Sequence, residues 1–134
     1  VVKLGIPVMG HIGFTPQHYN KFRLSGSLKR DRSKLLNEAK KNEKAGVFSL
    51  VVECVTNIAA KEITQSLKIP TIGIGASIHC DGQILVTDDM LGLSGFYPRF
   101  VKKFVKLNNI IKKGVQKYNK AVLSRKFPSK INTF

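Results

Sequence analysis

With 134 residues, 43% of them hydrophobic, the chain can bury the core of one domain, and its composition is not that of a disordered protein. It has no run of eighteen apolar residues, and residues 1–10 lack the basic start and cleavage site of a secretory signal, so we expect neither a membrane span nor export. The net charge of +15 would attract nucleic acid, but the basic residues show no aromatic interleaving and match no nucleic-acid-binding motif, so that role is not favoured.

The two cysteines and the start of the chain lead to two further expectations. Cys54 and Cys80 match no zinc or redox spacing and are too few for a secreted disulfide scaffold, so we expect free thiols and a cytoplasmic protein. The chain starts with Val1 rather than Met, and a strand-like segment begins within five residues of it. We therefore expect a fragment of a longer domain.

Short apolar runs alternate with longer amphipathic stretches, which is the pattern of βα units around a parallel sheet. Four of these runs predict strands, at Ile6–Met9, Phe48–Val52, Thr71–Ile74 and Gln83–Val86. The second run is continuously apolar, as is typical of a parallel strand that is covered on both faces. The chain therefore predicts an α/β fold with at least four parallel strands.

Three stretches predict helices. They are Ser33–Lys44, a segment that starts at Thr56 or Asn57 and runs through Leu67, and Pro98–Val122. Each has apolar residues at helical spacing, and proline is tolerated in the first turn of a helix. Gly114 leaves open whether the third stretch forms one long helix or two shorter ones. Its lysine-rich faces predict a solvated exterior.

Glycines and polar side chains follow each predicted strand. His11 comes after the first strand, Glu53 after the second, Gly75 after the third, and Asp88 and Asp89 after the fourth. Ligands of parallel α/β folds gather at the carboxyl ends of the strands, so this edge is the expected active-site face. The two aspartates have no third acid nearby, so we favour a helix-capping or loop role for them over a metal site.

Six segments carry a resemblance that covers about Ile6 to Pro128. They are Pro7–Gln17, Leu50–Val55, Ile69–Ala76, Cys80–Val86, Leu91–Leu93 and Pro98–Lys102. In this order and spacing they resemble the second half of ketopantoate hydroxymethyltransferases. The largest departure is Lys21–Arg32, because family members have a glycine-rich, tyrosine-containing loop there that ends in Gly-Arg. Folate recognition and turnover are the properties that this divergence would affect.

The resemblance implies a (β/α)8 TIM barrel of the phosphoenolpyruvate/pyruvate type. This chain would be the C-terminal half of that single barrel domain (residues 1–134) and would supply about strands 5–8 with their helices. It implies transfer of a hydroxymethyl group from 5,10-methylenetetrahydrofolate to 3-methyl-2-oxobutanoate, giving 2-dehydropantoate in pantothenate biosynthesis. It also implies a homo-oligomer and a Mg²⁺ ion with ligands in the missing N-terminal half, so the isolated fragment is expected to be inactive.

Glu53 and His11 are the candidate site residues at the first two strand ends. By resemblance Glu53 is the proton acceptor, because the reaction requires a proton to leave the carbon next to the ketone; the alternative is a structural carboxylate bonded to loop amides. His11 could bind substrate, orient another side chain, or be a structural histidine. His18 and His79 are expected at the surface, and the three histidines do not have a metal-ligand spacing.

Gly73 and Gly75 are candidate cofactor-binding residues, in a possible phosphate or cofactor cradle, although a lone Gly-x-Gly is a weak signal and close packing at the barrel mouth explains it better. Ser77 stands where the family usually has a further glycine. Two functions outside enzymology also stay open. One is a non-catalytic scaffold subunit derived from the enzyme, and the other is a basic nucleic-acid-binding module.

Overall fold

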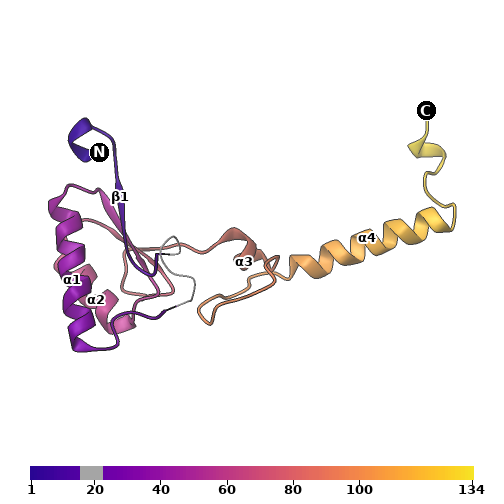
Figure 1. Cartoon of the computed structure of the whole chain (residues 1–134). Coiled ribbons are helices and arrows are strands. Elements are labelled where there is room, and N and C mark those ends of the chain that lie inside the picture. The colour runs from indigo at the N-terminus through magenta and orange to yellow at the C-terminus, as the bar shows by residue number, and fades with distance from the viewer. Residues whose placement is uncertain (16–22) are drawn as a thin grey trace. The chain divides into compact units, whose positions relative to one another are not determined.

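Four parallel strands form one sheet in the order β1-β2-β3-β4, which is also their order along the chain (Figure 1). They are β1 (Met9–Gly13), β2 (Ser49–Glu53), β3 (Thr71–Ile74) and β4 (Gly82–Gln83). This computed structural model describes residues 1–15 and 23–134. The predicted α/β class and the parallel pairing are confirmed.

The described residues form two compact units, which we call the sheet unit (Val1–Ile84) and the C-terminal unit (Leu85–Phe134). Besides the strands, the sheet unit contains a 3-10 helix at Val2–Leu4, α1 (Lys29–Lys44) and α2 (Asn57–Ser66). The C-terminal unit contains α3 (Thr87–Leu91), α4 (Leu107–Leu123) and a 3-10 helix at Lys130–Asn132. Within the described ranges, no helix is long and apolar enough to cross a membrane.

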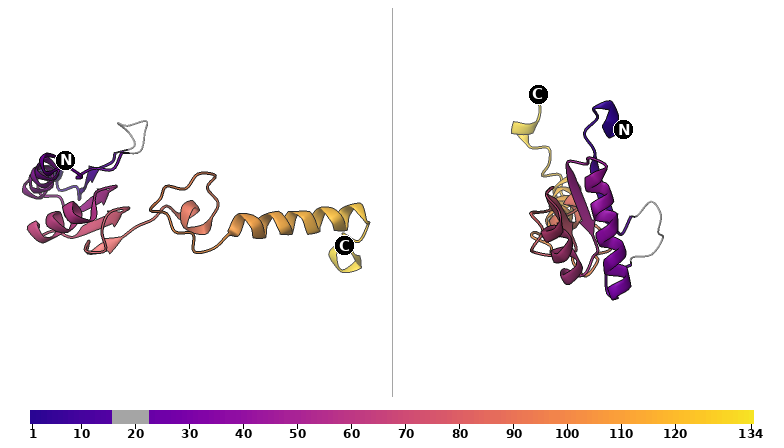
Figure 2. Two further views of the ribbon diagram at one scale, coloured as in Figure 1. Left: turned by 90° about the horizontal axis from the view of Figure 1, so that it is seen from below. Right: turned by 90° about the vertical axis from the view of Figure 1, so that its left-hand side faces the viewer.

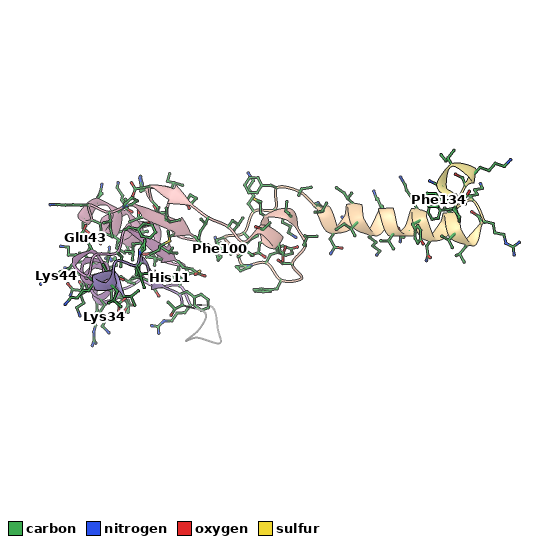
Figure 3. The ribbon with its side chains drawn as sticks, turned by 90° about the horizontal axis from the view of Figure 1, so that it is seen from above. His11, Lys34, Glu43, Lys44, Phe100 and Phe134 are labelled. Atoms are coloured by element: carbon green, nitrogen blue, oxygen red, sulfur yellow. The ribbon has the colours of Figure 1, made fainter. Side chains whose placement is uncertain are left out.

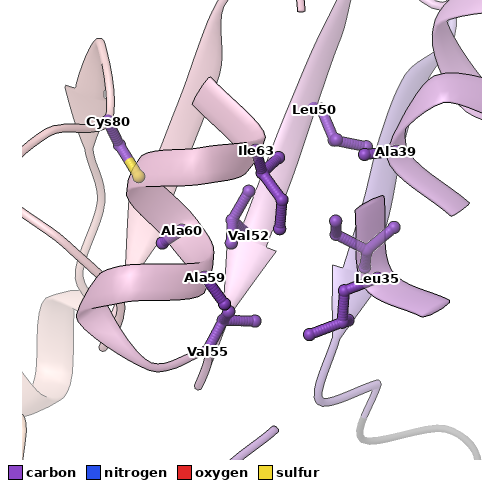
Figure 4. Close-up of a cluster of buried hydrophobic side chains, with 10 residues drawn as sticks. Leu35, Ala39, Leu50, Val52, Val55, Ala59, Ala60, Ile63 and Cys80 are labelled. Atoms are coloured by element: carbon purple, nitrogen blue, oxygen red, sulfur yellow. The ribbon is translucent and has the colours of Figure 1, made fainter. Parts of the chain in front are cut away.

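The core lies between one face of the sheet and the two helices α1 and α2, and Figure 2 gives two further views of these elements. Leu50 and Val52 of β2 are fully buried there. Val51, which lies between them, points to the other face because side chains alternate along a strand. The close-up in Figure 4 shows this cluster, which consists of Ile12, Leu35, Ala39, Leu50, Val52, Val55, Ala59, Ala60, Ile63 and Cys80.

Two predicted strand positions were wrong. The first strand is Met9–Gly13 rather than Ile6–Met9, because Pro7 has no N–H for a ladder and pairing with β2 overrides the low strand propensity of glycine. The last strand is Gly82–Gln83 rather than Gln83–Val86, because its pairing with β3 begins at Gly82 opposite Ile72, and β3 itself ends at Ile74, so Leu85 and Val86 have no strand beside them in the described sheet. The prediction for β3 was confirmed, and β2 lies one residue later than predicted.

The helices differ from prediction mainly at their starts. The first begins at Lys29 instead of Ser33, whose hydroxyl donates to the carbonyl of Lys29 within the helix rather than capping it. The second matches the prediction to within one residue. The third is a single helix that passes through Gly114 without a break, but it starts at Leu107 and leaves Pro98 outside.

Candidate active site

Glu53 is the last residue of β2, and its main chain is held from both neighbouring strands. The N–H of Phe14 donates to the carbonyl of Glu53 at 2.9 Å, and the next residue, Cys54, donates its N–H to the carbonyl of Ile74 at 2.9 Å. The side chain of Glu53 is 12% exposed and lies on the sheet face away from the core. The predicted base therefore sits at the carboxyl end of a central strand, where ligands of parallel sheets are found.

His11 contacts this carboxylate directly, since its Nε2 lies 3.0 Å from Oε2 of Glu53. The strand register explains the contact. His11 pairs with Val51, and Glu53 is two residues further along the same strand, so both side chains lie on one face of the sheet. Figure 3 labels His11, whose side chain is 32% exposed. The structure thus brings together the two site residues that the sequence singled out.

Gly13 faces Glu53 across the β1–β2 pair and has no room for a side chain. Its φ is +93°, and a Cβ there would lie 2.1 Å from the carbonyl oxygen of Glu53 and 2.8 Å from a methyl group of Val55. Only glycine fits this position. Sequence reasoning did not single out Gly13 for this reason, because the signal depends on the strand register.

Cys54 follows Glu53 in a left-handed conformation, with a φ of +51°. Burial, and secondarily the negative charge of Glu53, raises the pKa of the Cys54 thiol to about 11. The thiol is therefore protonated at neutral pH and is a poor nucleophile or metal ligand. Both Cys54 and Cys80 are free and buried, which confirms the prediction of free thiols.

The described part of the divergent segment Lys21–Arg32 is hydrogen-bonded to the residues just after Glu53. Lys21 and Phe22 lie outside the described residues, but the N–H of Ser25 donates to the carbonyl of Cys54 at 2.9 Å, and the N–H of Thr56 donates back to the carbonyl of Ser25 at 2.9 Å. The Thr56 hydroxyl adds a bond to the carbonyl of Gly26 at 2.9 Å. The described end of this loop is therefore part of the Glu53 neighbourhood.

Gly73 and Gly75 differ in what surrounds them. A Cβ on Gly73 would lie 2.9 Å from the side-chain amide oxygen of Gln83 and 3.1 Å from the sulfur of Cys80. The side chains of Gln83 and Cys80 therefore occupy the space next to this glycine. The Gln83 amide in turn donates to the carbonyl of Ser77 at 2.7 Å. Gly75 has a φ of +60° and allows the chain to turn after β3. Packing thus accounts for the absence of a side chain at Gly73.

The other polar candidates are two aspartates and two histidines. Asp88 and Asp89 occupy the first turn of α3, in the C-terminal unit, where negative charge is favourable, and neither side chain forms a cap. His79 is exposed as expected, and His18 lies outside the described residues. No group of three His, Cys, Asp or Glu able to hold a metal ion occurs in the part of the chain that the structure describes. The described residues therefore do not by themselves fit a Mg²⁺ site.

Comparisons with known proteins agree on one family. The family model described as ketopantoate hydroxymethyltransferase matches residues 1–130. The 3-methyl-2-oxobutanoate hydroxymethyltransferase of Pelagibacter ubique is 47% identical over 134 residues, covering 100% of this chain and 52% of the relative. Those of Zymomonas mobilis (number 2) and Sulfolobus acidocaldarius are 50% and 51% identical, covering 97% and 96% of this chain and 49% of each relative. The chain spans about half the length of these relatives, and it belongs to the ketopantoate hydroxymethyltransferase family.

Proposed function

We propose that this chain is the base-bearing half of an enzyme that transfers a hydroxymethyl group from 5,10-methylenetetrahydrofolate to 3-methyl-2-oxobutanoate, giving 2-dehydropantoate for pantothenate biosynthesis. One observation carries the proposal. The carboxylate of Glu53 lies at the carboxyl end of β2, on a side chain that is 12% exposed, with one oxygen bonded to His11. The family membership supplies the reaction class.

The step assigned to this chain is a proton transfer. The free oxygen of the Glu53 carboxylate accepts the proton from the carbon next to the ketone of the keto acid, and that carbon then forms its new bond to the methylene carbon of the folate. The carbon–nitrogen bonds of that methylene group break, water supplies the hydroxyl group of the product, and tetrahydrofolate leaves. A carboxylate that is held in place by its backbone and by a neighbouring side chain loses little entropy when it reacts. The Mg²⁺ ligands are assigned to polypeptide outside residues 1–134, and cofactor binding at Gly73 and Gly75 stays a prediction.

The sheet is proposed to be about strands 5–8 of a (β/α)8 barrel, with residues 1–134 as the C-terminal half of that barrel domain. Two features support this. The sheet face opposite the core carries Met9, which is 47% exposed, and the outer strands β1 and β4 each have one neighbour within the described sheet. The other barrel half would cover this face and extend the sheet. The active form is then a homo-oligomer of the longer chain in the cytoplasm, and the isolated chain is inactive.

The test uses the native gene product at its full length, assayed for 2-dehydropantoate formation with magnesium and methylenetetrahydrofolate. Glu53→Gln is expected to lower kcat by about 10²–10⁴-fold while the protein stays folded. Glu62→Gln is the matched control, because it makes the same chemical change at an exposed position on α2. Full activity of Glu53→Gln, or an inert parent protein, would overturn the proposal. Salt-sensitive retention on nucleic acid would instead support the basic binding module, and an inert but assembled protein the scaffold subunit.

A further inference from the structure

Within the proposed reaction, the contact between His11 and Glu53 decides which carboxylate oxygen can act. An ionised carboxylate only accepts hydrogen bonds, so the 3.0 Å contact requires that Nε2 of His11 carries the proton. We infer that His11 is a positioning residue, which donates Nε2–H to Oε2 of Glu53 and leaves Oε1 as the proton acceptor. This inference rests on the proposed function and assigns His11 a role through Glu53 rather than through the substrate.

The surroundings of the carboxylate support this assignment. The cross-strand position opposite Glu53 is Gly13, where a side chain is sterically excluded, so β1 reaches the carboxylate only through the diagonal residue His11. On the other side, the aligned residue of β3 is Ile74, whose side chain has no polar group. Among residues 1–15 and 23–134, His11 is the one side chain bonded to Glu53. Loss of its ring would therefore leave the carboxylate free to rotate.

The backbone that carries the His11 imidazole is held within the sheet. His11 is the central residue of β1, and the strand pairs on either side of it, Gly10 with Leu50 and Ile12 with Val52, lie over the core. The backbone that carries the ring is thus more rigid than a loop would be. Its second ring nitrogen, Nδ1, makes no hydrogen bond within the described ranges, so the contact with Glu53 accounts for the polar interactions of the ring there.

Three substitutions at position 11 distinguish a donor held in the right place from a donor that is misplaced or absent. The side-chain amide nitrogen of glutamine is as many bonds from the backbone as Nε2 of histidine, so His11→Gln keeps the donor where Glu53 needs it. The amide of asparagine is one bond shorter and fails to reach. His11→Leu removes the donor altogether. His79→Gln is the control, because His79 is exposed and the substitution makes the same chemical change away from β1.

The experiment isolates the base step. The full-length native protein is incubated in D2O with magnesium and 3-methyl-2-oxobutanoate but without folate, and NMR follows deuterium exchange at the carbon next to the ketone. We expect His11→Leu and His11→Asn to slow exchange about 100-fold with little change in KM, His11→Gln to restore it to within about tenfold, and His79→Gln to match the parent. Adding His11→Leu to Glu53→Gln should cause no further loss, because the histidine acts only through the carboxylate.

The outcomes distinguish this inference from the proposed function. If the parent protein exchanges no faster than Glu53→Gln, the proposed function fails. If exchange depends on Glu53 but His11→Leu exchanges at the parental rate, the positioning role fails alone. A raised KM with unchanged kcat in His11→Leu would make His11 a substrate contact instead. Thermal unfolding of each variant shows whether it is folded, and His11→Gln provides the answer if His11→Leu is not.

Discussion

The sheet unit and the C-terminal unit differ in how their apolar residues are used. In the sheet unit, the apolar stripes of α1 and α2 pack on β2, and ten residues form one buried cluster. In the C-terminal unit, α4 has no buried residue, and apolar side chains along it, such as Ile111 and Val115, are about half exposed. Helical periodicity therefore specifies the helix in both units, but it specifies a core only where the same unit supplies the facing surface.

The largest expected effect tests the close approach of β1 to β2. In Gly13→Ala, the new Cβ would collide with the Glu53 carbonyl at a φ of +93°, so we expect a loss of about 4 kcal/mol in the free energy of unfolding, measured with urea. The same change in the other unit, Gly114→Ala, meets no atom within 4 Å and should stabilise the protein by about 0.5–1 kcal/mol. Equal effects of the two substitutions would contradict the description of both sites.

A second comparison truncates one apolar side chain in each unit. Leu50→Ala removes a fully buried side chain of the sheet unit and should cost about 3 kcal/mol of unfolding free energy. Ile111→Ala shortens a side chain of α4 that is 49% exposed and should change it by less than about 0.5 kcal/mol. Chemical denaturation of the full-length native protein checks both values. A large effect of Ile111→Ala would show that α4 is covered in the intact protein. The two units would then differ in where the covering surface comes from, and not in whether their apolar residues are buried.

The smallest expected effect is a pH dependence confined to the sheet unit. The backbone N–H of Thr71, at 2.8 Å, and then its hydroxyl, at 3.0 Å, hold the pKa of Asp81 below its usual value. A depressed pKa contributes stability above the unfolded value, near 4, and this contribution disappears as the pH falls through the folded value. Because Asp81 is exposed and solvent screens it, we expect about 1 kcal/mol.

Thermal unfolding as a function of pH tests this for Asp81→Asn. The variant should be less stable than the parent at pH 7, and the two melting curves should approach each other below about pH 4 as the parental carboxylate is protonated. A difference that stays constant down to pH 2 would mean that the side-chain shape, and not the charge of Asp81, supports the turn before β4.

The sequence was sufficient for features that depend on local pattern. The apolar runs located β2 and β3 to within a residue, the helical stripe located α2, and the placement of Glu53 at a strand end followed from the run before it. The errors at β1 and β4 arose where pairing with a neighbour, rather than intrinsic preference, fixes the boundaries. The contact between His11 and Glu53 could not be predicted, because it depends on the register between β1 and β2, in which Gly10 pairs with Leu50, 40 residues later in the chain, and on a glycine at position 13. The start of α4 at Leu107 was missed because Pro98 suits a first turn but does not require one.

The hydrogen bonds beside Glu53 also bear on how this family member can diverge. The N–H of Phe14 donates to the carbonyl of Glu53, and the N–H of Ser25 donates to the carbonyl of Cys54. Phe14 and Ser25, which both lie between β1 and α1, are therefore bonded to consecutive residues at the end of β2. An insertion, deletion or substitution between these two fastened points changes the span without shifting either anchor. Sequence change between Phe14 and Ser25 can therefore accumulate while the hydrogen bonds at the end of β2 stay in place and His11 keeps its contact with Glu53.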